Sequence, residues 1–117
     1  MNLDAPVESK TTITPEVINT IVRFNALTVE GMSGFASQST SMNRLFSNSP
    51  TDGMKVVVEN NTVYIDLFVV LKNDVNVRTV CRKIQNTVAR AITEMVGMDI
   101  GRINIHVEDF ESGSSPE

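Results

Sequence analysis

Residues Gly53 to Leu71 read GMKVVVENNTVYIDLFVVL, two runs of mainly apolar, β-branched residues separated by Asn60-Asn61. Asparagine tolerates the positive φ that a two-residue hairpin turn requires, so this stretch predicts an antiparallel hairpin over 54–71. The turn also fixes the register of the hairpin, and a pair of opposite charges across the strands supports it. The predicted opposed pairs are Met54 with Leu67, Lys55 with Asp66, Val56 with Ile65, Val57 with Tyr64 and Val58 with Val63.

The strand period of two sorts the hairpin side chains into two faces of different character. One face is wholly apolar and is predicted to cover the core: Met54, Val56, Val58, Val63, Ile65, Leu67, Val69 and Leu71. The other mixes apolar, aromatic and charged side chains: Lys55, Val57, Glu59, Thr62, Tyr64, Asp66, Phe68, Val70 and Lys72. We call this second side of the sheet the open face.

Two amphipathic helices are predicted, one on each side of the hairpin. The first spans 15–30, with Thr14 as N-cap, Pro15 at the first helical position and Gly31 as the residue that ends it. The second spans 77–96 and ends at Gly97. The side chains assigned to the buried sides are Val17, Ile18, Ile21, Val22, Phe24, Ala26 and Val29 in the first helix, and Val77, Val80, Cys81, Ile84, Val88, Ala91, Ile92 and Met95 in the second.

A third strand is predicted over 102–108, where Ile103, Ile105 and Val107 alternate with polar residues. The expected fold class is therefore α+β, in the order α-β-β-α-β, with a three-stranded sheet and both helices packed on one face. The right-handed crossover rule orients the third strand parallel to the second. It leaves open whether the third strand pairs with the first or with the second.

The remaining segments are expected to lie outside the regular elements. Residues 1–12 are predicted to be a flexible arm, 13–110 a single domain and 111–117 a disordered tail. Residues 32–53 are rich in Ser, Gly and Asn and are expected to form a loop. Within that loop, the helical spacing of Met42, Leu45 and Phe46 leaves one short turn of helix open.

Charge and composition restrict the classes of function. The net charge is −4, but residues 13–107 carry nine basic and eight acidic side chains, which argues against strong non-specific binding to nucleic acid or anionic membrane. The longest apolar run, Leu67 to Leu71, is far too short to span a bilayer. The single cysteine excludes an internal disulfide, and the N-terminus lacks the pattern of a signal peptide, so we expect an intracellular location.

Few residues are candidates for catalysis or metal binding. Cys81 lies within the apolar stripe of the second helix, and a buried thiol is a poor nucleophile. His106, the only histidine, should share the open face with Asp66, and a solvated strand histidine is favoured over a His–Asp contact. We therefore expect no enzyme activity, no metal site and no cofactor.

Two surfaces remain as candidate binding sites. Apolar side chains on the open face favour docking of a second subunit or a partner protein, unless residues 32–53 cover them; both interpretations stay open. The basic side of the second helix, together with the GxxG string at Gly31 to Gly34, favours an alternative in which a KH-like module binds nucleic acid. That string has no basic residue, so protein interaction is preferred. The candidate residues are Val57, Tyr64, Phe68, Val70 and His106 on the open face, and Arg78, Arg82, Lys83 and Arg90 on the basic side.

Four blocks of sequence occur in an order and spacing that resemble the alkaline-shock, or envelope stress response, protein family of bacteria. They are TITPEVINTIV from Thr12, LTVEGMSGF from Leu27, GMKVVVENNTVYIDLFVVL from Gly53 and VNVRTVCRKIQNTVARAITEMVGMDIGRINIHVEDF from Val75. The resemblance implies a small, non-enzymatic cytoplasmic domain that acts in cell-envelope homeostasis. It also implies self-association or a membrane-anchored protein partner, and it identifies no catalytic or ligand-binding residue.

Overall fold

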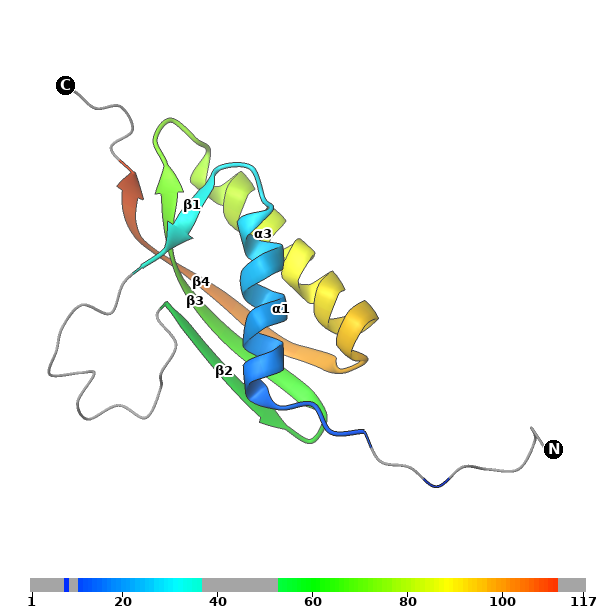
Figure 1. Cartoon of the computed structure of the whole chain (residues 1–117). Helices are drawn as coiled ribbons and strands as arrows, with labels where there is room; N and C mark the ends of the chain where they lie inside the picture. Colours follow the sequence, from blue (N-terminus) through cyan, green and yellow to red (C-terminus); the bar gives the residue numbers. More distant parts are fainter. Residues whose placement is uncertain (1–7, 9–10, 37–52, 112–117) are drawn as a thin grey trace, which may run out of the picture.

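The long strand β3 (Thr62–Lys72) forms the centre of the sheet. The structure, a computed structural model, describes residues 8, 11–36 and 53–111. Helices α1 (Pro15–Leu27) and α3 (Val77–Ala91) lie side by side over one face of this sheet (Figure 1). The structure therefore confirms the α+β class and the placement of both helices on one side.

The hairpin pairs in the predicted register. Strand β2 (Met54–Glu59) runs antiparallel to β3, with Lys55 opposite Asp66 and Val57 opposite Tyr64. The connecting residues Asn60 and Asn61 have φ of 51° and 63°. These values are the left-handed conformation that asparagine accepts more readily than most residues.

The sheet has four strands, not the three that were predicted. The additional strand is β1 (Met32–Phe35), which lies within the segment expected to be a loop. It pairs antiparallel with β3 from Val69 to Leu71, so β1 and β2 follow each other along the same edge of β3. Each occupies a different part of that edge, and the layered arrangement therefore remains close to the predicted one.

Strand β4 (Asp99–Glu111) occupies the other edge of β3 and runs parallel to it. This pairing decides between the two alternatives that the sequence left open. The strand is longer than the predicted 102–108, and its register with β3 shifts beside Gly101 and Glu108. Between these two irregularities, residues 102–107 pair regularly with β3.

The core lies between the two helices and the apolar face of the hairpin. From α1 it contains Ile18, Val22 and Ala26, which follow one another at intervals of four residues on one side of the helix. Phe24 falls two residues from both Val22 and Ala26, so it points away from the sheet and is 70% exposed. The other buried side chains include Val63, Ile65, Leu67, Val69 and Leu71 of β3, and Val80, Ile84, Val88 and Ala91 of α3.

Five predicted core residues are therefore wrong; one of them is Val77, the first residue of α3, which is 38% exposed. Phe24 and Val17 lie on the outward side of α1, and Met95 lies outward in the π-helical turn η1 (Ile92–Val96) that follows α3. Val58 is exposed because it lies next to the hairpin turn, at the end of the sheet.

The helix ends differ from the prediction at one place. Helix α1 ends at Leu27 rather than at residue 30, and Gly31 lies in the turn that leads into β1, with φ of 101°. A Cβ on Gly31 would come within 2.8 Å of the Val80 side chain, so glycine lets this turn approach α3. Gly97, with φ of 78°, ends η1 as predicted. The predicted helical turn at 42–46 lies outside the described residues, as do most of the arm and the tail.

Candidate functional site

The open face is built by the parallel pairing of β3 and β4. This pairing sets Arg102 beside Tyr64, Asn104 beside Asp66 and His106 beside Phe68. Among the described residues, no helix or strand packs over this side, because both helices lie on the other (Figure 1). Polar side chains of one strand thus lie next to aromatic and acidic side chains of its neighbour.

Asp66 is the centre of the polar contacts on this face. Its Oδ1 accepts a hydrogen bond from Asn104 Nδ2 at 3.1 Å and lies 3.0 Å from His106 Nε2. The hydrogen bond with His106 is the main cause that lowers the pKa of Asp66, and the bond from Asn104 and the charge of Lys55 act in the same direction. Partial burial of the carboxylate opposes them. The structure therefore favours a charged Asp66.

His106 departs from the sequence interpretation. A solvated histidine without a carboxylate contact was favoured, but the side chain contacts Asp66 while it stays 44% exposed. Its ring also stacks on Phe68, with the ring centroids 4.6 Å apart and the planes inclined by 13°. The imidazole is therefore held both through its edge and through its face.

Tyr64 is held at the other end of the open face. The guanidinium carbon of Arg102 lies 5.3 Å from the centroid of its ring, within the range of a cation–π contact. The ring also covers the backbone of Gly101, where an added Cβ would lie 2.8 Å from Tyr64 Cδ1. Sequence analysis missed Gly101, Arg102 and Asn104, although the alternation over 102–108 already placed the last two on the same face as His106.

The structure brings the predicted residues of the open face onto one surface. Val57 is exposed, whereas Tyr64, Phe68 and Val70 are half-buried. Val70 lies at the far end, opposite Gly34 of β1 and Asp109 of β4. Because the side chains of β4 lie against the aromatic rings, the face is more polar and better ordered than the apolar patch that was predicted.

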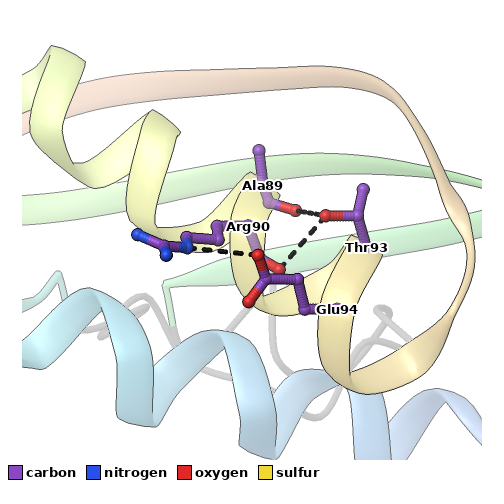
Figure 2. Close-up of polar contacts among 4 residues, drawn as sticks. All are labelled: Ala89, Arg90, Thr93 and Glu94. Carbon is purple, nitrogen blue, oxygen red and sulfur yellow. Dashed lines mark hydrogen bonds and ion pairs between the residues drawn. The ribbon is translucent and has the colours of Figure 1, made fainter.

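The alternative basic side of α3 is less continuous than expected. Arg78, Arg82 and Lys83 are exposed, but Arg90 Nε lies 3.2 Å from Glu94 Oε2. Figure 2 shows this ion pair beside the Thr93 hydroxyl, which donates to the carbonyl oxygens of Ala89 and Arg90 at 3.0 and 3.1 Å. The positive charge of Arg90 is thus partly neutralised at the end of the helix.

The GxxG string does not form the loop expected of a KH domain. Gly31 ends a turn, and Met32, Ser33 and Gly34 belong to strand β1. The side chain of Met32 is buried in the core, and the backbone of this string pairs with β3.

Two further observations concern chemistry and membranes. Burial raises the pKa of the Cys81 thiol, which lies half-buried on α3, beneath the other face of the sheet. The described residues contain no group of three or more His, Cys, Asp or Glu side chains that could hold a metal ion. Nor does any helix in the described ranges have the length and apolar character needed to cross a membrane.

Comparisons with known proteins give one family model and two bacterial relatives that match most of this chain. A model of the alkaline shock protein 23 family, described as having a cell envelope-related function, matches residues 4–112. The uncharacterized protein Spy1535 of Streptococcus pyogenes serotype M6 is 30% identical over 108 residues, which cover 90% of this chain and 81% of that protein. The uncharacterized protein YqhY of Bacillus subtilis is 26% identical over 100 residues, covering 84% of this chain and 74% of that protein.

Solved structures resemble this chain in fold. The structure titled MamM CTD in a copper form superposes with a TM-score of 0.59 and 14% identity, covering 88% of this chain and 93% of that domain. A nickel form of a variant of the same domain gives a TM-score of 0.57 with 13% identity, over 82% of this chain and 99% of that one. At this level of identity, the similarity concerns the fold alone.

Proposed function

Because the chain belongs to the alkaline shock protein 23 family, we propose that it is a non-enzymatic protein-interaction module that serves the cell envelope. In this proposal the open face binds a protein partner, either a membrane-anchored protein or a further copy of the chain. The module works in the cytoplasm and reaches the membrane through that partner. The family description supports the link to the envelope, and the open face supports the mode of action.

The observation that carries this proposal is the order already present on the open face. Asp66 bonds two neighbouring side chains, Phe68 stacks on His106, and Arg102 lies over Tyr64. Side chains that are held before binding lose less conformational entropy when a partner docks. Tyrosine and arginine are also enriched among the residues that dominate protein interfaces.

The same contacts favour binding over catalysis. In nucleophilic catalysis, a histidine–carboxylate pair activates a side-chain nucleophile that lies within hydrogen-bond reach of the imidazole. The thiol of Cys81 lies on α3, which packs on the opposite side of the sheet from His106 and Asp66. We therefore assign the pair a positioning role within a binding surface.

The proposal is tested by capture of partners from membrane and cytosolic fractions, using the wild-type chain and a Tyr64→Lys, Phe68→Glu variant. We expect the variant to stay folded, as judged by circular dichroism, and to lose the partners that the wild type captures. The matched control is an Arg78→Ala, Arg82→Ala variant, which changes the other surface and should retain them.

Two outcomes would contradict the proposal. A folded open-face variant that captures the same partners would place the binding surface elsewhere. Micromolar binding of single-stranded RNA at physiological salt, abolished in the Arg78→Ala, Arg82→Ala control, would instead support the nucleic-acid alternative. Fluorescence anisotropy with a labelled oligonucleotide measures that binding directly.

A further inference from the structure

The outer edge of β4 is the longest strand edge that the described residues leave without a neighbouring strand. Strand β4 is 13 residues long, and among the described strands it pairs with β3 only. An edge of this kind presents backbone N–H and C=O groups that can pair with another strand. The devices that usually prevent such pairing include lysine, proline and β-bulges. Strand β4 contains neither lysine nor proline, and its two register irregularities lie at the ends of the regular stretch 102–107.

The apolar core also continues to this edge. On β3 the three central residues that face the helices are at most 1% exposed, whereas their partners on β4 are only half-buried although they pack against the same core. The pairs are Ile65 with Ile103, Leu67 with Ile105, and Val69 with Val107. A strand added beside β4 would complete the burial of its three half-buried side chains, Ile103, Ile105 and Val107.

The sequence of β4 is complementary to itself. Residues 102–108 read RINIHVE, with a positive charge at one end, a negative charge at the other and apolar residues alternating between them. If two copies of β4 run antiparallel about a two-fold axis at Ile105, Arg102 of each copy lies opposite Glu108 of the other. The same register sets Ile103 opposite Val107 and Asn104 opposite His106.

Neighbouring registers lose this complementarity. An axis one residue earlier, at Asn104, would set Arg102 opposite His106 and would leave its charge without an acidic partner. An axis one residue later, at His106, would set Ile103 opposite Asp109 and would place a carboxylate against the apolar strip. Of these three registers, the one about Ile105 sets opposite charges against each other and apolar side chains against apolar side chains.

We propose that β4 pairs antiparallel with β4 of a second copy of this chain, about a two-fold axis at Ile105. The pairing joins two sheets into one and sets both open faces on the same side. Gln85 Nε2 of α3 donates to the carbonyl of Ile103 at 2.9 Å, and this oxygen keeps a second lone pair for a bond across the interface. The inference goes beyond the proposed function, because it concerns the edge of the sheet and names the occupant.

Charge reversal tests the register. Sedimentation equilibrium of the wild type over a range of concentrations should show a dimer. Arg102→Glu alone, or Glu108→Arg alone, sets like charges opposite each other twice per dimer, and each should raise the dissociation constant by roughly tenfold or more. The double exchange Arg102→Glu, Glu108→Arg restores opposite charges and should recover dimerisation. A wild type that stays monomeric, or a dimer indifferent to both single reversals, would overturn the proposal.

A disulfide test needs no change of charge. Residues directly opposed in antiparallel strands have Cα atoms about 4.5–5.5 Å apart, within the range that a disulfide spans. In a Cys81→Ala background, Ile105→Cys should form a covalent dimer on mild oxidation. Val57→Cys, on the exposed strand at the other edge of the sheet, is the matched control and should remain monomeric. Equal cross-linking of the two variants would refute the axis at Ile105.

The Tyr64→Lys, Phe68→Glu variant removes the rings that contact Arg102 and His106 of β4, so it would disturb the proposed pairing as well. A Val57→Glu variant changes the open face on β2, at the other edge of the sheet, and therefore separates this proposal from the preceding one. Dimerisation that survives in this variant while partner capture is lost supports both proposals. Dimerisation that is lost with it, in a folded protein, places self-association on the open face and overturns pairing through β4.

Discussion

Whether Gly101→Ala stabilises or destabilises the protein should depend on Tyr64, because the Tyr64 ring packs over Gly101. Gly101 does not have the positive φ that Gly31, Gly53 and Gly97 have, so its backbone can accept alanine without strain. In such a position Gly→Ala stabilises a protein by about 0.4–1 kcal/mol, because it restricts the unfolded chain. Here, however, the new methyl group would lie 2.8 Å from both Cδ1 and Cζ of the Tyr64 ring.

This contact is too short to persist, so the ring must move away from its place beside Arg102. Overpacking of this kind destabilises by about 1–3 kcal/mol. After subtraction of the entropic gain, Gly101→Ala should lower the free energy of unfolding by up to about 2.6 kcal/mol. In a Tyr64→Ala background the obstructing ring is absent, and the same substitution should raise the free energy of unfolding by about 0.4–1 kcal/mol.

Urea unfolding of the four proteins of this double-mutant cycle measures both values in one experiment. The slope of the free energy against urea should be similar in all four, so that differences in midpoint report stability. If Gly101→Ala changes stability by the same amount with and without Tyr64, the ring does not rest on residue 101 and the described geometry of the open face is wrong.

Two further predictions concern the core and the acidic centre of the open face. Ile84→Ala should lower the free energy of unfolding by about 2–5 kcal/mol, because Ile84 is fully buried. Arg82→Ala, on the same helix, should be almost neutral. Similar losses for the two variants in thermal or urea unfolding would contradict the orientation of α3. The pKa of Asp66 is lower in the folded protein than in the unfolded chain, so the unfolded chain binds more protons as the pH falls. The stability that this carboxylate contributes is therefore present above about pH 4 and is lost as the pH falls through the lowered pKa. Asp66→Asn should therefore make the free energy of unfolding depend less steeply on pH in the acid range. The same slope in the wild type and in the variant would contradict the view that the folded protein stabilises the charged carboxylate of Asp66.

The hairpin was predictable because local chemistry determines it. Asn60 and Asn61 form a two-residue turn, and such a turn leaves one register for the strands that it joins. The face of β3 that enters the core then follows from the alternation of its side chains. The class of fold and the side on which both helices pack follow from the same alternation.

Other features depend on contacts that no local pattern encodes. The register of a parallel pair is not set by a turn, so the alignment of Asp66 with Asn104 and of Phe68 with His106 could not be derived from the sequence. Strand β1 contains four residues, Met-Ser-Gly-Phe, which are too few and too mixed to show a period of two. Phe24 was misplaced because the apolar side of α1 is broad, and an apolar side chain pointing outward looks the same in sequence as one pointing inward.

The succession of β1 and β2 along one edge of β3 has a consequence for how this chain can vary. The two strands meet at Phe68: its carbonyl accepts from the amide of Ala36, at 2.7 Å, and its amide donates to the carbonyl of Gly53, at 2.8 Å. Ala36 and Gly53 are thus bonded to the same residue of β3. The entropy of closing a connection grows only with the logarithm of its length, so lengthening the connection between these two anchors adds little to the entropic cost of closing it. Phe68 therefore acts as a common anchor for the two ends of this connection, so that a change in the connection's length can leave the hairpin, both helices and the ring stack with His106 in place.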